Sequence, residues 1–288
     1  MLSRRQFLAS TALLGAGCSP RLVHEERSAF SHIRVRADGS IRSLMFITGT
    51  GREITQTRLD LQAPHELLSP YTRYMFLSQL LVSDPRRVLL VGLGGGAMVH
   101  FLARYYPRTI VDAVEIDPAI VRVAGSHFGV VASARLHIHT ADIYEFVRDD
   151  HGPYDTVYMD AFLPPATGTD PGGAPLRVKT TAFYRHLRQR LAPNAAVTFN
   201  AIDHPYLAQD IETIDAAFSH PLVFDVPGTR NRVIVAGTAP PPDRATLGSR
   251  AASLDAALDV GFEFAELLSH QAAPPTRPAV HDPPRSIR

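Results

Sequence analysis

The stretch RRVLLVGLGGGAMVHFL, residues 86–102, restricts the fold of this chain more than any other segment. It joins a short apolar run to four glycines (Gly92, Gly94, Gly95 and Gly96) and then to residues with helical spacing. Glycines in this place let the backbone turn tightly and approach a ligand, and the helix that follows presents oriented N–H groups. NAD, FAD and S-adenosylmethionine folds all use such a loop. A phosphate-binding P-loop is excluded, because no Gly-Lys-Ser/Thr follows.

Strand-like and helix-like segments alternate around this loop. Strands are predicted at 87–91, 110–115, 135–139, 154–159, 195–200, 221–226 and 231–237. Helices are predicted at 69–81, 95–106, 118–128, 143–149, 180–191, 205–218 and 244–258. This alternation predicts an α/β fold with a doubly wound parallel sheet, and the last two strands are close enough to form an antiparallel hairpin at its edge.

The chain divides into five segments. Residues 31–62 are predicted to form a small β-appendage, because 32–47 alternate polar and apolar residues around an Asp38-Gly39 turn. Residues 19–30 are interpreted as a tether and 63–260 as a Rossmann-like catalytic domain. Residues 261–288 are predicted to be a disordered tail, since the chain is Pro-rich beyond 271.

The first 18 residues are interpreted as a targeting segment. Arg4 and Arg5 precede an apolar run that is well under the roughly 20 residues needed to span a bilayer. The layout resembles a twin-arginine export signal, which predicts a periplasmic protein. Cys18 follows LLGAG and stands where a lipoprotein would be lipidated and anchored to the membrane, although Gly15 occupies the place usually held by Leu. Simple cleavage after small residues remains the alternative.

Composition excludes several classes of function. The 288 residues carry a formal net charge of +1, without the concentrated basic patch that a nucleic-acid partner needs. The single cysteine excludes an intrachain disulfide and a Cys-x-x-Cys motif. His137 and His139 are alternate residues of one predicted strand and share a face, but the sequence shows no third ligand beside them. We interpret them as solvated or packed side chains and predict no metal.

Three acids at the ends of successive strands suggest the ligand. Glu115 ends the second strand, about 20 residues after the glycines, where an acid accepts hydrogen bonds from ribose hydroxyls. Asp142 follows the third strand, where it could meet an adenine amino group, and Asp160 ends the fourth. Asp142 and Asp160 have no standard role in NAD binding, so the set favours an adenosyl-sulfonium ligand.

Residues 32–237 resemble the spermidine synthase family, the polyamine aminopropyltransferases. The resemblance is carried by segments such as LDLQAPHELLSPYTRYMFLSQLL, VLLVGLGGGAM, VDAVEIDPAIVRVA, ADIYEFV and YDTVYMDAF. It is strongest to the divergent spermidine-synthase-like branch. It implies a class I S-adenosylmethionine-methyltransferase-like sheet with an N-terminal β-domain. It also implies transfer of an aminopropyl group from decarboxylated S-adenosylmethionine to a putrescine-type amine, which releases methylthioadenosine.

The resemblance also implies roles for individual residues. The nucleoside donor would be held by Gln56, Gly92, Gly94, Gly95, Gly96, Glu115, Asp142 and Ile143. Asp160 would be the general base that deprotonates the attacking amine, and Tyr71 would line the amine pocket. No tightly bound cofactor is expected, because decarboxylated S-adenosylmethionine, or S-adenosylmethionine itself, is a co-substrate. By analogy with the family, the chain is expected to form a homodimer.

Two positions depart from the family pattern. Ala97 stands where the family has an acid directly after the glycines, and Leu163 stands where it has a second acid three residues after the base. Both family acids help to hold cationic amines, and a dication is costly to desolvate without paired carboxylates. Asp170, in the loop 161–179, is a candidate substitute.

Two alternatives stay open at this stage. The first is a methyltransferase that uses intact S-adenosylmethionine, although Leu90 occupies the position of the acid usually found two residues before the first glycine. The second is an exported, non-catalytic nucleoside-binding relative. The missing amine acids favour it, and so does the export signal, because donors of this type are made in the cytoplasm.

Overall fold

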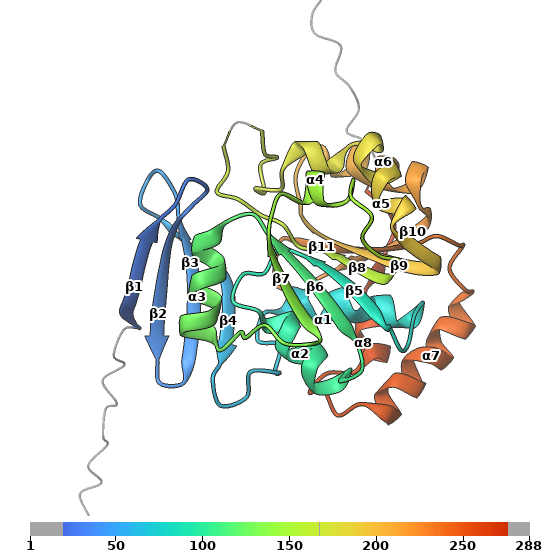
Figure 1. The fold of residues 1–288 in the computed structure, drawn as a ribbon. Helices are drawn as coiled ribbons and strands as arrows, with labels where there is room; N and C mark the ends of the chain where they lie inside the picture. The colour runs from blue at the N-terminus through green and yellow to red at the C-terminus, as the bar shows by residue number, and fades with distance from the viewer. Residues whose placement is uncertain (1–19, 167, 276–288) are drawn as a thin grey trace, which may run out of the picture.

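The computed structural model describes residues 20–166 and 168–275 and shows two sheets (Figure 1). The small sheet consists of β1 (Arg21–Arg27), β2 (His32–Asp38), β3 (Ile41–Ile47) and β4 (Glu53–Asp60), paired antiparallel in that order. The strands of the large sheet are β5 (Arg87–Val91), β6 (Ile110–Glu115), β7 (Leu136–Thr140), β8 (Tyr154–Met159), β9 (Leu191–Ile202), β10 (Ser219–Asp225), β11 (Asn231–Gly237) and β12 (Gln271–Ala272).

The large sheet has the strand order β12-β10-β11-β9-β8-β5-β6-β7. Strands β7, β6, β5, β8 and β9 run parallel, whereas β11, β10 and β12 pair antiparallel at the other end. The doubly wound class I methyltransferase-like sheet with an N-terminal β-appendage is therefore confirmed, as is the hairpin of β10 and β11. The order of the strands along the chain reverses at β5, because β6 lies on one side of it and β8 on the other.

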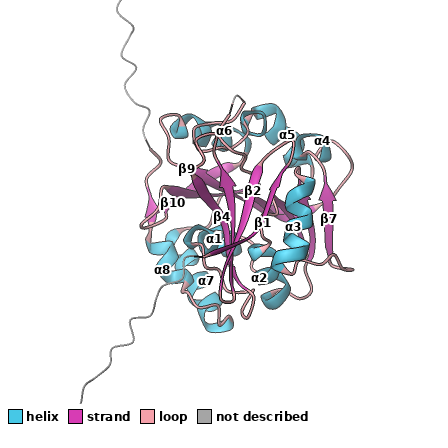
Figure 2. Cartoon of the chain, turned by 90° about the vertical axis from the view of Figure 1, so that its left-hand side faces the viewer, coloured by secondary structure: helices cyan, strands magenta, loops and turns pink. Residues whose placement is uncertain are grey.

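Helices cover both faces of the large sheet (Figures 1 and 2). They are α1 (Pro70–Met75), η1 (Phe76–Leu80), α2 (Ala97–Tyr105), α3 (Pro118–Phe128), α4 (Ile143–Phe146), η2 (Leu176–Lys179), α5 (Thr181–Gln189), α6 (Leu207–Ala217), α7 (Arg244–Ala257) and α8 (Phe264–Ser269). In Figure 1, α4, α5 and α6 lie above the sheet, and α2, α7 and α8 lie below it. Two hydrophobic cores result, one on each face of the sheet.

Local sequence signals explain several of these boundaries. Helix α3 begins after Asp117, whose side chain caps the helix by accepting a hydrogen bond from the Ala119 N–H, and Pro118 occupies its first turn. It ends at Gly129, which adopts the left-handed conformation with φ of 71°. The predicted helix over 69–81 is instead two short pieces, α1 and the 3-10 helix η1.

Two of the predicted boundaries are wrong. Residues 21–27 are not part of a tether but form β1, which pairs with β2. Polar cross-strand contacts hold β1, such as the ion pair of Glu25 with Arg34, so the strand lacks the apolar alternation that would have revealed it. The predicted disordered tail also begins too early, because α8 and β12 are ordered and Phe264 is fully buried.

The predicted export signal and Cys18 lie outside the described residues. Within residues 20–166 and 168–275, no helix combines the length and the apolar character that crossing a membrane requires.

Candidate active site

A cavity of about 580 Å³ opens at the carboxyl ends of β5, β6 and β8, where the strand order reverses. Its walls come from the small sheet, α1, the glycine loop and the segment that follows β8. A crevice at such a reversal is where α/β sheets bind their ligands, and this volume suits one small molecule. Most of the residues predicted for the site line this cavity.

The four loop glycines do not share one role. Gly92 and Gly94 line the cavity, whereas Gly95 and Gly96 are not among its lining residues. Gly92 has φ of +91°, and a Cβ there would lie 2.3 Å from the main-chain oxygen of Asp160. Gly96 has φ of +73°, and its Cβ would lie 2.3 Å from a methyl group of Val130. Packing within the protein therefore requires part of this glycine cluster, whatever ligand it holds.

Glu115 lies at the end of β6 and is locked to the glycine loop. Its Oε2 accepts a hydrogen bond from the Leu93 N–H at 2.9 Å, and its Oε1 accepts one from the Asp117 N–H at 3.0 Å. Burial raises the pKa of Glu115, while the hydrogen bonds from these N–H groups oppose the rise. Glu115 thus lines the cavity with its carboxyl group held in place by two main-chain N–H groups.

Asp142 caps α4 and is already engaged by a cation. Its Oδ1 accepts a hydrogen bond from the Tyr144 N–H at 3.0 Å, and its Oδ2 forms an ion pair with Arg177 of η2. The Arg177 guanidinium also lies over the Tyr144 ring, 5.7 Å from its centroid. Ile143, the first residue of α4, is buried and lines the same part of the cavity.

Gln56 on β4 brings the small sheet into the site. It lines the cavity, and its Nε2 donates to the Ile54 carbonyl oxygen at 3.3 Å. The next residue, Thr57, accepts a hydrogen bond from the Gly95 N–H at 2.9 Å through its hydroxyl. The small sheet is therefore hydrogen-bonded to the glycine loop as well as forming a wall of the cavity.

Asp160 lies at the end of β8 between two hydrogen-bond donors. The Tyr71 hydroxyl donates to its Oδ2 at 3.0 Å, and Asn200 Nδ2 donates to its Oδ1 at 2.8 Å. Asn200 is in turn held by Asn231, whose Nδ2 donates to Asn200 Oδ1 at 2.8 Å. The carboxyl group is oriented from both sides while its residue lines the cavity.

The surroundings of Asp160 tune its basicity. Burial raises its pKa to about 6, the hydrogen bonds from Asn200 and Tyr71 oppose that rise, and the charge of Glu115 adds to it. The pKa of Tyr71 lies well above its ordinary value, because the phenol is buried beside this carboxylate. At pH 7–8 Asp160 is thus mostly ionised and able to accept a proton, while Tyr71 remains a donor.

The departures from the family pattern leave the cavity wall apolar at two points. Ala97 and Leu163 both line the cavity. Asp170 does not replace the missing charge, because it is not a lining residue and forms an ion pair with Lys179. Its Oδ1 also accepts main-chain hydrogen bonds from Gly172 and Ala174 at 2.8 and 2.9 Å.

Sequence reasoning missed two residues of the site, Asn200 and Arg177. Asn200 comes near the end of β9, so the rule that selected Glu115 and Asp160 would have found it had amides been included with acids. Arg177 gave no signal, because the short helix η2 follows an irregular segment whose path depends on tertiary contacts. Its ion pair with Asp142 connects the segment after β8 to the predicted adenine site.

The fold and the polar groups at its strand ends define a class I methyltransferase-like protein. The family model of the spermine/spermidine synthase domain matches residues 70–227. The chain therefore belongs to the spermine/spermidine synthase family, as the sequence resemblance predicted.

Individual proteins share part of this sequence or this fold. The chain is 26% identical over 242 residues to a polyamine aminopropyltransferase of Vibrio vulnificus, with 82% of this chain and 79% of the relative covered. The crystal structure of a probable spermidine synthase from Corynebacterium glutamicum matches with a TM-score of 0.68 and 18% identity, over 91% of this chain and 100% of that one. Human methyltransferase-like protein 13, solved in complex with SAH, matches with a TM-score of 0.60 and 24% identity, over 66% of this chain and 92% of that one.

Proposed function

We propose that this protein transfers an aminopropyl group from decarboxylated S-adenosylmethionine to an amine acceptor of the putrescine type. The observation that carries the proposal is the position of Asp160, an oriented carboxylate in the same cavity as Glu115 and Asp142. Family membership supports the same transferase chemistry.

In the proposed reaction, Glu115 binds the ribose hydroxyls and Asp142 accepts a hydrogen bond from the adenine amino group. The acceptor nitrogen attacks the aminopropyl carbon bonded to the sulfonium sulfur. The new C–N bond forms as the C–S bond breaks. The electron pair of the broken C–S bond stays on sulfur, which gives methylthioadenosine. The proton lost by the nitrogen passes to Asp160, whose pKa of about 6 suits a base at neutral pH.

The apolar side chains of Ala97 and Leu163 affect which acceptor amines the site can bind. The described lining residues include four acids, Glu115, Asp117, Asp142 and Asp160. In the proposed reaction Asp160 is the partner of the attacking nitrogen. A second ammonium group that reached the wall formed by Ala97 and Leu163 would lose water without gaining a carboxylate. We therefore expect diamines to bind more weakly than a family site with both acids would allow.

The test is product analysis. Purified protein is incubated separately with decarboxylated and with intact S-adenosylmethionine, each with a panel of mono- and diamines, and products are detected by mass. Methylthioadenosine together with an aminopropylated amine supports the proposal, and the Asp160→Asn variant should form neither. Absence of both products from every amine would contradict it.

A methyltransferase is the second candidate, favoured by the fold match to a methyltransferase and by the loss of the two acids. The same incubation distinguishes it, because intact S-adenosylmethionine would then yield S-adenosylhomocysteine and a methylated acceptor. Binding of the nucleoside without either product would instead indicate a non-catalytic relative.

We also propose that the chain is exported by the twin-arginine route, lipidated at Cys18, and a homodimer. The support is the Arg4-Arg5 pair, the position of Cys18 and analogy with the family. Loss of membrane association in Cys18→Ser would support the lipid anchor, and periplasmic recovery of wild-type protein without any lipid would contradict it. Light scattering of the purified protein gives the oligomeric state.

A further inference from the structure

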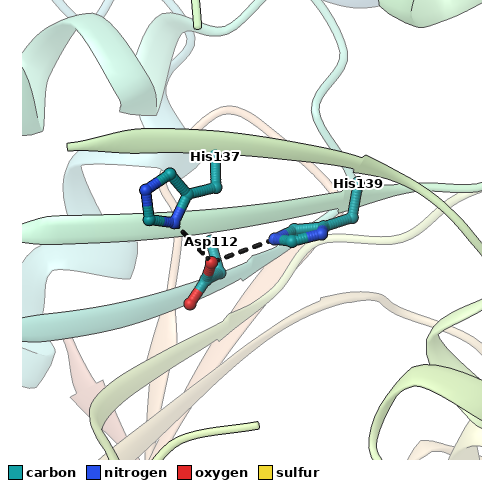
Figure 3. A group of neighbouring side chains, drawn as sticks. All are labelled: Asp112, His137 and His139. Atoms are coloured by element: carbon teal, nitrogen blue, oxygen red, sulfur yellow. Dashed lines mark hydrogen bonds and ion pairs between the residues drawn. The ribbon is translucent and has the colours of Figure 1, made fainter. Parts of the chain in front are cut away.

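Two histidines and a buried aspartate converge on the large sheet, away from the strand-end cavity (Figure 3). Asp112 lies on β6, and His137 and His139 lie on the neighbouring strand β7. His137 Nδ1 and His139 Nε2 each lie 3.0 Å from the same oxygen, Asp112 Oδ1. Asp112, the third residue of the cluster, was not predicted from the sequence, because it precedes His137 by 25 residues and lies inside an apolar strand.

The Asp112 carboxylate is fixed from its other side. The Tyr154 hydroxyl donates to its Oδ2 at 3.0 Å, and Arg87 Nη2 donates to the same oxygen at 3.2 Å. Oδ1 is left facing the two imidazoles, and the positive charge of Arg87 is held at the opposite oxygen. Such outer contacts orient carboxylate ligands in metal sites.

The three side chains bring their ligand atoms together, since these atoms all lie within 4.8 Å of one another. A carboxylate oxygen and two imidazole nitrogens form a donor set that suits Zn²⁺ and its first-row neighbours.

Asp112 is buried, whereas the two histidines are partly exposed to solvent. The Asp112 side chain is 4% exposed, whereas those of His137 and His139 are 45% and 32% exposed. Strand β7 is the edge strand of the sheet, so solvent reaches the imidazoles directly. An ion can therefore enter and keep water molecules as its remaining ligands.

Two of the three donor spacings are already close to those of a zinc site. Two ligands bound about 2.0 Å from a tetrahedral Zn²⁺ stand roughly 3.3 Å apart, only slightly more than the 3.0 Å between each histidine nitrogen and Asp112 Oδ1. Small rotations of the two exposed imidazoles would make room for an ion. A ring N–H that donates to Asp112 would have to be lost, or moved to the other ring nitrogen, when the ion binds.

We propose that Asp112, His137 and His139 bind one divalent first-row transition-metal ion of the zinc class. The ion would join β6 to the edge strand β7 on the side of the sheet where His139 contacts Phe146 of α4. It lies outside the cavity lining, so the proposal stands whether or not the transferase activity is found.

The test uses the full protein after removal of metal with a chelator. Titration with Zn²⁺ should show one tight equivalent, and Co²⁺ should give visible absorption bands of a four- or five-coordinate site. Zn²⁺ should also raise Tm, because the ion binds only the folded state. The variant His137→Gln/His139→Gln should lose at least ~100-fold in affinity, together with the Co²⁺ bands and the Tm shift.

The control is His186→Gln, on α5 and outside the cluster. It should bind Zn²⁺ like the wild type. Both substituted histidines are partly exposed, so the double variant should fold, and circular dichroism checks that it does. The Asp112→Asn variant is avoided, because it would leave Arg87 facing a neutral group. Wild-type protein that binds no Zn²⁺ tightly, or a double variant that binds it equally well, would overturn the proposal.

Discussion

The Tyr71 hydroxyl lies 3.0 Å from Asp160 Oδ2 and joins α1 to the end of β8 across 89 residues of sequence. This bond orients the proposed base and stabilises its charged form, since a hydrogen bond to a carboxylate lowers its pKa. The Asn200 amide contributes a second such bond at 2.8 Å. Together these two donors oppose the effect of burial on Asp160.

Tyr71→Phe should therefore raise the pKa of Asp160 above its value of about 6. A hydrogen bond to a charged group contributes about 1.5–3 kcal/mol, so we expect the acidic limb of the kcat–pH profile to move upward by about one unit. At pH 7, kcat should fall roughly twofold, because the ionised fraction of Asp160 drops from about nine-tenths to about a half, and it should recover at pH 9. An unchanged acidic limb would mean that Tyr71 does not act through Asp160.

Asp160→Asn should abolish transfer but stabilise the fold at high pH. The folded-state pKa is raised to about 6 from 3.8, so the ionised carboxylate disfavours folding above pH 6, and that cost vanishes as the pH falls below 4. The asparagine can keep the bond from Asn200 without this cost.

Urea unfolding at pH 8 should thus show the Asp160→Asn variant to be more stable than wild type by about 1–3 kcal/mol, with the difference disappearing near pH 4. Asp150→Asn, at an exposed side chain, is the matched control and should show no such pattern. A pH-independent difference would indicate a change in packing and not in charge.

Arg177→Ala should strengthen binding of methylthioadenosine. Arg177 forms an ion pair with the Asp142 carboxylate, which is proposed to accept a hydrogen bond from the adenine amino group. The nucleoside therefore has to compete with this ion pair. Because the Arg177 side chain is about half exposed, the pair contributes at most about 1 kcal/mol. This corresponds to an increase of up to about fivefold in affinity. Weaker binding in a calorimetric titration would show that Arg177 contacts the nucleoside itself.

Ala97→Asp combined with Leu163→Glu should shift acceptor preference toward diamines. Both positions line the cavity, and Ala97 is the first residue of α2, where a negative charge is also favoured by the helix dipole. We expect KM for putrescine to fall at least ~10-fold, the value of one added ion pair of about 1.4 kcal/mol, while KM for butylamine changes little. An equal change for both amines would show that the substitutions do not contact the second nitrogen.

The features that were predicted correctly from the sequence are those that depend on residues close together along the chain. Glu115 and Asp160 end apolar strands, and Asp117, Pro118 and Gly129 delimit a helix through capping. Strand β1 was missed because cross-strand ion pairs hold it in place of an apolar face. Such contacts depend on which strand becomes the neighbour, and that is a property of the folded sheet.

Parts of the site depended on tertiary contacts in the same way. Arg177 in η2 reaches Asp142 from 35 residues away, and the sequence before η2 has no periodicity that would place it. Asp112 meets His137 only because β6 and β7 pair in a register that sets these two residues side by side. The glycine loop was located correctly, but the packing of Gly96 against Val130 could not be inferred from the sequence of the loop.

The most direct test of the account is a calorimetric comparison of methylthioadenosine with its 6-oxo analogue, methylthioinosine. Wild-type protein should prefer the adenosine form, because Asp142 accepts a hydrogen bond from its amino group. Asp142→Asn keeps an oxygen to cap α4 and should lose or reverse that preference. Wild-type protein that binds neither nucleoside would contradict both the adenosyl-sulfur site and the transferase built on it.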